Sequence, residues 1–493
     1  MIILMRNITC SVLLTALSLA QVDASCAEVL LIKTDKILRT GSDNVVGINL
    51  NYIRDHDANR PHGAKKIKEV LRTMGVRWLR YPGGEKSDRH FWSNPPYTAP
   101  EVTSIGWYAK PQGCRMDFDD YMALVEATGS RPYVVVAYDS KKRTGISKAR
   151  FLKHAVAWVK YANKIKDYKV EYWEIGNENW HNKTATPREM AGIVAEFSRA
   201  MKEVDPSIKI GASGNNPEWW NVFLPKAAPH LDFVSLSLYN VWKWKGYDFY
   251  PKHPNQDLIH PVRQALKAIN TLPEEDRKRL QVVVAETNSK DYSKDGWPDD
   301  NSLGHAIVIF DTLGQLLQQE RVAAAMLLTT RWMNDADSQK SIWYGLGPNN
   351  EIRPSGRAVA IWGAFAHDTM VACQSSSKMV TVYASRSTKS GELSIFVINK
   401  GFESLGRDFR IDVESPNIYR ISEVHRFGGK GADDVDPYWK RVTEGRIDYN
   451  LISGLGLPGV SITVIVLKPI RNMNAEQAVS VGPRRRSATE PRR

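Results

Sequence analysis

Two apolar segments of this chain stop at a glutamate, and they limit what the chain can fold into more than any other feature. The run Val170–Ile175 leads into Gly176-Asn177-Glu178-Asn179-Trp180, and the run Gln281–Ala285 leads into Glu286-Thr287-Asn288. Short, nearly continuous apolar runs of this kind predict strands that are buried on both faces. Glu178 and Glu286 are 108 residues apart, which leaves room for about three βα units. The pattern therefore predicts two carboxyl groups at the carboxyl ends of strands in one parallel sheet.

Strand-like and helix-like segments alternate over residues 45–369. The strand candidates are Val45–Leu50, Val76–Tyr81, Pro132–Ala137, Val170–Ile175, Lys209–Ala212, Phe233–Leu238, Val282–Glu286 and Ala323–Thr329. The helix candidates are Ala64–Met74, Met122–Ala127, Phe151–Ala162, Met190–Val204, Val262–Ile269, Leu303–Leu317 and Arg357–Ala366. Strict alternation over eight units predicts a closed (β/α)8 TIM barrel. A doubly wound open sheet is the alternative, but no glycine-rich phosphate loop follows the first strand.

The pattern changes near residue 370. Five segments with strand character follow, at Met379–Ala384, Leu393–Ile398, Phe409–Val413, Tyr419–Phe427 and Val460–Leu467. These segments either alternate apolar with polar residues or are continuously apolar, and Gly, Ser, Pro and Asp lie between them. This pattern predicts a C-terminal antiparallel β-sandwich at residues 370–470. The N-terminal segment 25–44 is expected to add a strand to it through Val29–Ile37. The basic tail, residues 471–493, is polar and arginine-rich and is predicted to be disordered.

Residues 1–24 read as a secretory signal peptide. Arg6 supplies the positive charge, Ile8–Ala20 the apolar stretch and Val22-Asp23-Ala24 a small-residue cleavage site. The expected location is therefore secreted or periplasmic. Lipid anchoring through Cys26 is an alternative, although Asp23 stands where such signals place an aliphatic residue. No later run approaches the roughly 20 apolar residues that a membrane span needs.

Composition excludes several classes of function. The chain has 493 residues, of which 42% are hydrophobic and 25% charged, as in globular proteins. Its net charge of +13 permits non-specific attraction to acidic polymers, but the chain lacks zinc-finger, basic-helix and RNA-binding signatures, so no nucleic acid partner is expected. The spacings of Cys and His do not suit a metal site, and no metal or cofactor is expected. The oligomeric state stays open.

The two strand-end glutamates fit one kind of chemistry. Glycosidases place two carboxyl groups on either side of a glycosidic bond, roughly 5–5.5 Å apart when configuration is retained and roughly 6.5–9.5 Å apart when it is inverted. We expect Glu178 to be the general acid/base, holding a proton in a partly desolvated pocket, and Glu286 to be the nucleophile. One strand-end glutamate is more often a salt bridge or cap. Two in the same context favour catalysis of glycoside hydrolysis by a retaining mechanism.

Three further side chains are candidates for contacts around the glutamates. Arg80 ends the second predicted strand, where its guanidinium could hold Glu286 ionised and oriented. Tyr239 ends the sixth, and its hydroxyl could donate to Glu286. Asn177 could bind the sugar hydroxyl next to the reacting carbon. The alternatives are a rim ion pair for Arg80 and a core position for Tyr239.

Aromatic residues follow many of the predicted strands. Sugars present apolar C–H faces that stack on aromatic rings, so these residues are candidate subsites, and core packing is the alternative for each. The set comprises Trp173, Trp180, Trp219, Trp220, Trp242, Trp244, Trp297, Trp332 and Trp343. Trp332, just after the eighth strand, is our candidate for a subsite floor.

At these motifs the sequence resembles glycoside hydrolase family 51 of clan A, the α-L-arabinofuranosidase family. The matching segments are Leu79-Arg80-Tyr81-Pro82-Gly83-Gly84, Tyr172–Glu178, Asp205-Pro206 and Ala285–Asn288. The resemblance implies a barrel with a sandwich, an acid/base after strand four, a nucleophile after strand seven and a carbohydrate substrate. Asn-Glu after strand four is shared by the whole clan, so it identifies mechanism better than substrate.

The sequence departs from the family at three positions of the sugar pocket. Asn51 aligns with the family's sugar-binding glutamate, Glu85 with an asparagine and Ser237 with a histidine. These changes leave the two-glutamate chemistry intact but weaken the case for arabinofuranose. Asn51 and Glu85 remain candidate substrate contacts.

Three other functions are consistent with parts of the sequence. The first is an endo-β-glycanase or β-xylosidase of the same clan, which the number of loop tryptophans favours. The second is a non-catalytic carbohydrate-binding barrel, which the presence of both glutamates disfavours. The third is a metal- or nucleotide-dependent barrel enzyme, which would need acidic clusters or a phosphate loop that the sequence lacks.

Overall fold

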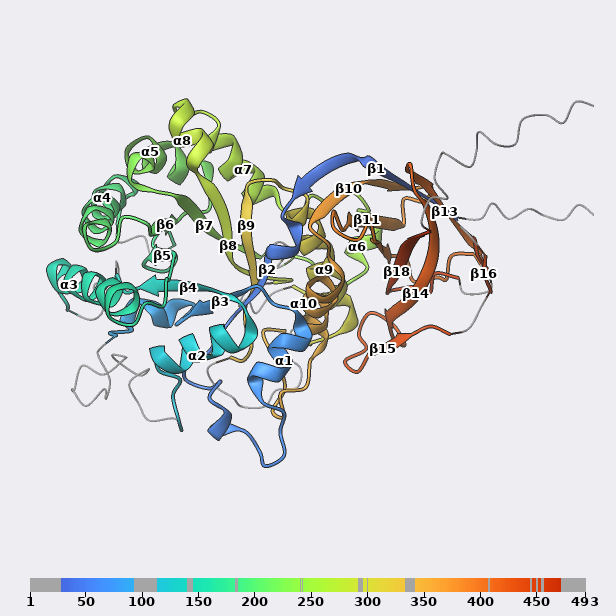
Figure 1. Ribbon diagram of the computed structural model, residues 1–493, viewed down its shortest axis with the longest axis horizontal. Coiled ribbons are helices and arrows are strands. Elements are labelled where there is room, and N and C mark those ends of the chain that lie inside the picture. Colours follow the sequence, from blue (N-terminus) through green and yellow to red (C-terminus); the bar gives the residue numbers. More distant parts are fainter. Residues whose placement is uncertain are drawn as a thin grey trace, which may run out of the picture.

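The chain folds into a barrel with a large sheet beside it, and β1 (Glu28–Thr40) connects the two (Figure 1). The computed structural model describes residues 28–92, 113–139, 145–181, 185–239, 241, 243–290, 296–298, 300–332, 342–406, 408–443, 446–448, 451–453 and 456–470. The predicted signal peptide 1–24, Cys26, Trp242 and the tail 471–493 lie outside these residues.

Eight parallel strands close the barrel in chain order, and this confirms the predicted TIM barrel. The strands are β2 (Val46–Asn49), β3 (Trp78–Tyr81), β4 (Arg131–Val136), β5 (Tyr172–Ile175), β6 (Lys209–Ser213), β7 (Phe233–Tyr239), β8 (Gln281–Asn288) and β9 (Val322–Leu327). Nearly all their residues are buried, because side chains facing inward fill the barrel and those facing outward pack under the helices.

Helices cover the outside of the barrel (Figure 1). They are α1 (Ile67–Met74), α2 (Phe118–Thr128), α3 (Lys148–Val159), α4 (Pro187–Val204), α5 (Pro217–Ala227), α6 (Phe249–Lys252), α7 (His260–Ile269), α8 (Glu274–Arg279), α9 (Leu303–Leu317) and α10 (Pro354–Phe365). The start of α4 shows how sequence sets a boundary. Thr186 and Glu189 form a reciprocal capping box around Pro187, which satisfies amide groups that the first turn leaves unpaired.

The second body is a ten-stranded sheet with its own apolar core. Its strands are β1 (Glu28–Thr40), β10 (Thr369–Ser375), β11 (Val380–Arg386), β12 (Leu393–Asn399), β13 (Phe409–Glu414), β14 (Ile418–Gly428), β15 (Tyr438–Arg441), β16 (Arg446–Asp448), β17 (Leu451–Ser453) and β18 (Ser461–Ile470). β1 pairs antiparallel with β10 and parallel with β13. The first strand of the described chain therefore sits inside a sheet built mainly from its last hundred residues.

The structure also describes two of the cysteines and the character of the helices. Cys114 and Cys373 are free thiols. Within the described residues, none of the helices has both the length and the apolar character that crossing a membrane requires.

Candidate active site

Arg80 is the centre of the polar cluster at the carboxyl ends of the barrel strands. Its guanidinium is buried, and Nη1 donates to Glu286 Oε1 at 2.7 Å and to Asn49 Oδ1 at 3.0 Å. Nη2 donates to Glu174 Oε2 at 2.9 Å and to Asn177 Oδ1 at 2.8 Å. Burial alone would lower the pKa of Arg80, but the carboxylates of Glu174 and Glu286 outweigh it and raise the pKa above its usual value. Arg80 is therefore a permanent cation that joins its own strand, β3, to β2, β5 and β8.

Glu286 reaches this cluster because β8 is irregular next to it. Val283 and Ala285 both belong to the apolar cluster inside the barrel, so simple alternation would turn Glu286 outward. The register with β7 shifts between Leu236 and Ser237, and Ser237 then pairs with Glu286. Bulges of this kind re-aim side chains and are common next to active sites. Here the shift brings Glu286 inward to Arg80.

A tyrosine completes the surroundings of Glu286. Tyr239, the last residue of β7, donates from its hydroxyl to Glu286 Oε2 at 2.8 Å. Each carboxylate oxygen of Glu286 thus has a donor of its own, because Arg80 serves Oε1. The contacts predicted for Arg80 and Tyr239 are both present. They hold Glu286 in one orientation.

Glu178 lies just beyond β5 on an unusual backbone. Gly176 has a φ of 66° and Glu178 a φ of 44°, so both adopt left-handed conformations. A Cβ at Gly176 would collide with the side chain of Asn179, which explains the glycine. Glutamate rarely adopts a positive φ, and such strain persists where surrounding structure enforces it, often at functional sites. The half-buried Glu178 is thereby held at the same end of the barrel as Glu286.

The segment around Glu178 is fixed from two sides. The backbone N–H of Asn177 donates to Asp88 Oδ1 at 2.9 Å, and that of Asn179 donates to Ser213 Oγ at 3.2 Å. Asn177 Oδ1 is occupied by Arg80. Its Nδ2 group donates to no residue in the described ranges, so it can donate to a ligand.

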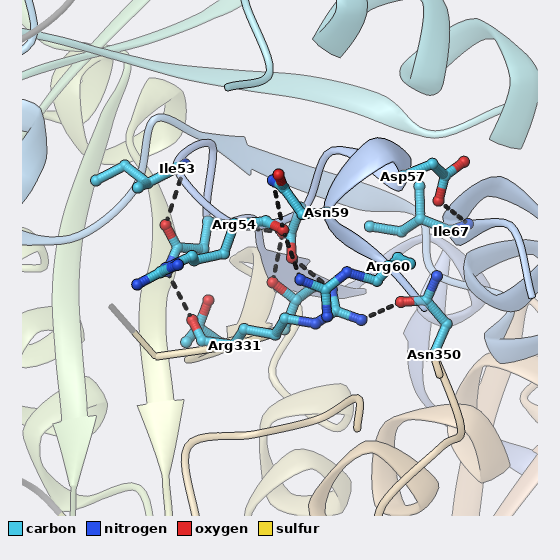
Figure 2. A network of polar contacts seen from close by, with 12 residues as sticks. Ile53, Arg54, Asp57, Asn59, Arg60, Ile67, Arg331 and Asn350 are labelled. Carbon is cyan, nitrogen blue, oxygen red and sulfur yellow. Dashed lines mark hydrogen bonds and ion pairs between the residues drawn. The ribbon is translucent and has the colours of Figure 1, made fainter. Parts of the chain in front are cut away.

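A network of polar contacts that includes Ile53, Arg331 and Asn350 ties the loop after β2 to the segment after β9 (Figure 2). Asn51 takes part in it through two hydrogen bonds. Its Nδ2 donates to the carbonyl oxygen of Arg331 at 3.0 Å, and its Oδ1 accepts from the N–H of Ile53 at 3.2 Å. Arg331 forms a buried ion pair with Asp55 at 2.6 Å and also binds Asn350. The side chain of Asn51 is thus engaged in holding the rim together. Its predicted contact with substrate stays a prediction.

The other predicted substrate contacts lie around the rim. Trp332 follows the clamped Arg331 and stacks on Trp343, with ring centroids 5.2 Å apart. Trp180 is partly buried next to Glu178. Glu85 is exposed at the first position of a 3-10 helix, η3 (Glu85–Arg89). The residue of η3 that enters the site is instead Lys86, which is buried near Glu286.

Sequence reasoning did not select Glu174 or Lys86. Glu174 is an acidic residue in the middle of the apolar strand β5, and besides Arg80 it accepts a hydrogen bond from Ser235. A carboxylate in a fully buried strand needs a cation, and that rule could have paired it with Arg80. Lys86 carries no such signal, because its burial depends on the path of the turn before it.

The described part of the chain shows no set of side chains that could bind a metal ion. No group of three or more His, Cys, Asp or Glu side chains there is arranged to hold a metal ion.

Known proteins give an independent view of the chain. The family model for the α-L-arabinofuranosidase 1 domain matches residues 70–252, which include Arg80, Glu178 and Tyr239. α-L-arabinofuranosidase C of Emericella nidulans is 26% identical over 210 residues, 36% of this chain and 40% of that protein. An intracellular exo-α-(1→5)-L-arabinofuranosidase of Streptomyces lividans is 25% identical over 195 residues, 35% of this chain and 29% of that protein. The chain thus matches less than half the length of these relatives.

Solved structures extend the likeness to nearly the whole chain. α-L-arabinofuranosidase of Thermotoga maritima, in complex with arabinose, has a TM-score of 0.68 at 19% identity and covers 90% of this chain and 100% of that one. The chain resembles the family 51 glycoside hydrolases of clan A. A family 51 α-L-arabinofuranosidase of Bifidobacterium longum has a TM-score of 0.72 at 15% identity, covering 89% of this chain and 99% of that one. The family 51 layout of barrel and sheet is therefore shared, and at such identities the likeness concerns the fold.

Proposed function

We propose that this family 51-like protein is a retaining O-glycosyl hydrolase, similar in type to the α-L-arabinofuranosidases, that acts on polysaccharides or oligosaccharides. The observation that carries the proposal is Glu286, with Arg80 on one carboxylate oxygen and Tyr239 on the other. A donor on each oxygen holds such a carboxylate in one orientation, which a nucleophile needs. The left-handed backbone that holds Glu178 beyond β5 supports its role as the acid/base.

The reaction has two displacements. Glu286 attacks the anomeric carbon, the glycosidic C–O bond breaks, and Glu178 gives its proton to the leaving oxygen. A covalent glycosyl-enzyme results. Glu178, now a carboxylate, takes a proton from water, and the water oxygen attacks the same carbon and releases Glu286. At the end of the cycle Glu178 is protonated again and Glu286 is a carboxylate again, so the enzyme is regenerated.

Other residues supply binding. The Nδ2 group of Asn177, for which the described residues offer no acceptor, can donate to the hydroxyl beside the reacting carbon, a contact that strengthens in the transition state. The stacked pair of Trp332 and Trp343 offers an aromatic surface at the rim of the barrel. These contacts orient the sugar and thereby lower the activation barrier of the reaction, but they take no part in proton transfer.

The test is hydrolysis of a panel of 4-nitrophenyl glycosides and polysaccharides by the wild type, Glu286→Gln and Glu178→Gln. We expect wild-type turnover of at least one substrate and a loss of several orders of magnitude in Glu286→Gln. The matched control is Glu171→Gln, because Glu171 flanks the other end of β5 and pairs with Arg131 and Lys209 there. Unchanged turnover in Glu286→Gln would refute Glu286 as the nucleophile, and no turnover of any substrate by the wild type would leave a carbohydrate-binding barrel as the better account.

The same panel separates exo from endo action. Release of nitrophenol from the α-L-arabinofuranoside would indicate an exo-acting arabinofuranosidase. Shortening of a polysaccharide without release from any small glycoside would indicate an endo-acting enzyme, the second candidate. That candidate is supported by the Trp332–Trp343 pair, which suits a cleft with several subsites.

We also propose that residues 1–24 direct the protein out of the cytoplasm. The supporting observation is the sequence pattern of Arg6 and the apolar stretch Ile8–Ala20. N-terminal sequencing of the protein from its host checks this. A mature chain that starts at Ser25 or close to it supports export, a lipid-modified Cys26 supports anchoring, and an intact Met1 contradicts both.

A further inference from the structure

Lys86 is placed beside Glu286 by a turn that only glycine can make. Gly84 has a φ of 64° and a ψ of −166°, a region that residues with side chains do not adopt. A methyl group built on Gly84 would lie 3.6 Å from Glu286 Oε1 and 3.8 Å from Lys86 Nζ. The ammonium and the carboxylate therefore flank the same point, and η3 carries Lys86 into the site and leaves Glu85 in solvent.

The Lys86 side chain is buried, and its ammonium has no partner among the residues that the structure describes. Lys86 is 6% exposed, and neither a hydrogen bond nor an ion pair joins its Nζ to any residue that the structure describes. Other buried lysines are paired. Lys290 Nζ donates to the carbonyl of Trp297 at 2.6 Å, and Lys400 Nζ to that of Pro254 at 2.6 Å. Buried charges are normally paired because desolvation is costly, so Lys86 stands out.

The acidic groups near Lys86 already have donors. Glu286 is served by Arg80 and Tyr239. Asp55, the other carboxylate that acts on Lys86, is held by Arg331 at 2.6 Å. Neither carboxylate needs the ammonium as a hydrogen-bond donor. Its three N–H groups are therefore available to a ligand that enters next to Glu286.

We propose that Lys86 determines specificity by binding a negatively charged substituent, a carboxylate or a sulfate, on the sugar unit placed against Glu286. The substrate class is then an acidic polysaccharide or its oligosaccharides. This inference rests on the proposed glycosidase function. Charge-assisted hydrogen bonds are about twice as strong as neutral ones, so an anionic group satisfies a buried ammonium better than a hydroxyl does. The net charge of +13 attracts acidic chains over longer distances.

A different role for Lys86 makes a different prediction. Arg80 is shared by two carboxylates, Glu174 and Glu286, so Lys86 could serve only to balance their charge. A residue with that role would affect neutral and acidic substrates alike. A residue that binds the substituent affects only substrates that carry it.

The experiment compares matched substrates that differ only in charge. Oligosaccharides from uronic-acid polymers are assayed before and after reduction of their carboxylates to alcohols, and sulfated oligosaccharides before and after desulfation. The enzymes are the wild type, Lys86→Met, Lys86→Arg and the control Lys68→Met, whose lysine is exposed on α1. The two substrate sets show whether the anion is a carboxylate or a sulfate.

We expect wild-type kcat/KM to favour the charged member of one pair, and Lys86→Met to lower it by roughly 10- to 100-fold on that member alone. Lys86→Arg should keep part of the preference and Lys68→Met all of it. An equal loss on charged and neutral members, or wild-type cleavage of neutral glycosides only, overturns the inference. If the inference about Lys86 fails in this way, Glu286→Gln decides the proposed function separately. Loss of activity in that variant, on any substrate that the wild type cleaves, still supports a glycosidase.

Binding provides a second readout if Lys86→Met does not fold. The dissociation constants of wild type for the charged and neutral members are then compared by calorimetry at two salt concentrations. Tighter binding of the charged member that weakens with salt is expected. Equal affinities contradict the role of Lys86 whether or not the protein hydrolyses the ligand.

Discussion

At the scale of single residues, one buried guanidinium organises the site. Arg80 donates to four acceptors, which belong to Asn49, Glu174, Asn177 and Glu286. The sequence predicts its contact with Glu286, because an arginine at a strand end next to a paired glutamate is a recognisable pattern. It does not predict Glu174 as a second partner, since strand periodicity says which face a residue occupies and not which neighbour it meets.

Replacing Arg80 by lysine tests this arrangement. A single ammonium cannot reproduce the planar fork that reaches all four acceptors. We expect Arg80→Lys to lower kcat by roughly 100-fold or more, in the range measured when one stabilising donor is removed from an active site. Steady-state kinetics and the melting temperature are the measurements. Wild-type kcat in a folded Arg80→Lys protein would show that Glu286 does not depend on this contact.

The charge on Lys86 predicts a pH effect. Burial lowers the pKa of Lys86 to about 8, while Glu286 raises it and Arg80 lowers it; Asp55 and His90 are the other titratable groups nearby. The ammonium is thus mainly protonated below about pH 8 and mainly neutral above it. We expect kcat/KM for an acidic substrate to fall as pH rises through about 8. The charge-neutralised substrate should lack this limb, and so should Lys86→Met; identical profiles would contradict the assignment.

At the scale of elements, the sequence predicts where the barrel strands lie but not where their pairing is irregular. The apolar runs predict all eight barrel strands, because burial on both faces leaves a clear compositional mark. The shift in β8 that turns Glu286 inward leaves none, since it depends on pairing with β7. Short strands such as β16 (Arg446–Asp448) and β17 (Leu451–Ser453) were also missed. Three residues are too few to show a period.

The turn before η3 gives an element-scale prediction. In Gly84→Ala the methyl group has space, but the backbone conformation at φ 64° and ψ −166° is strained by about 1–3 kcal/mol. We expect lower stability together with lower kcat/KM, because the turn places Lys86 next to Glu286. Gly129→Ala is the control, with a left-handed φ of 64° at the end of α2 and nothing within 4 Å. It should lose stability and keep activity.

At the scale of the whole molecule, the barrel and the ten-stranded sheet are packed together. Phe396 of β12 lies against Trp362 of α10, with ring centroids 4.2 Å apart, and also near Phe310 of α9. The buried Asp311 of α9 accepts from the Tyr383 hydroxyl of β11. Apolar and polar contacts thus cross the junction, and β1 adds a covalent link before the barrel begins. The sequence predicts both bodies but not this contact.

A single substitution at the junction tests whether the two bodies unfold together. Phe396 is fully buried, and Phe396→Ala should lower the free energy of unfolding by about 3–5 kcal/mol. We expect one thermal transition at a lower temperature, with barrel and sheet lost together. Ile418→Ala, at a position 56% exposed on β14, should have little effect. Two separate transitions, with the barrel unchanged, would show that the bodies are independent.

The central claim is that Glu286 is the nucleophile of a retaining glycosidase. The most direct measurement is proton NMR of the first product released from a cleaved glycoside, before mutarotation, together with azide rescue of Glu286→Gly. The account predicts a first product with the anomeric configuration of the substrate, and a rescued product that is the glycosyl azide of opposite configuration. An inverted first product from the wild-type protein, or the absence of that azide in a rescued reaction, would contradict it.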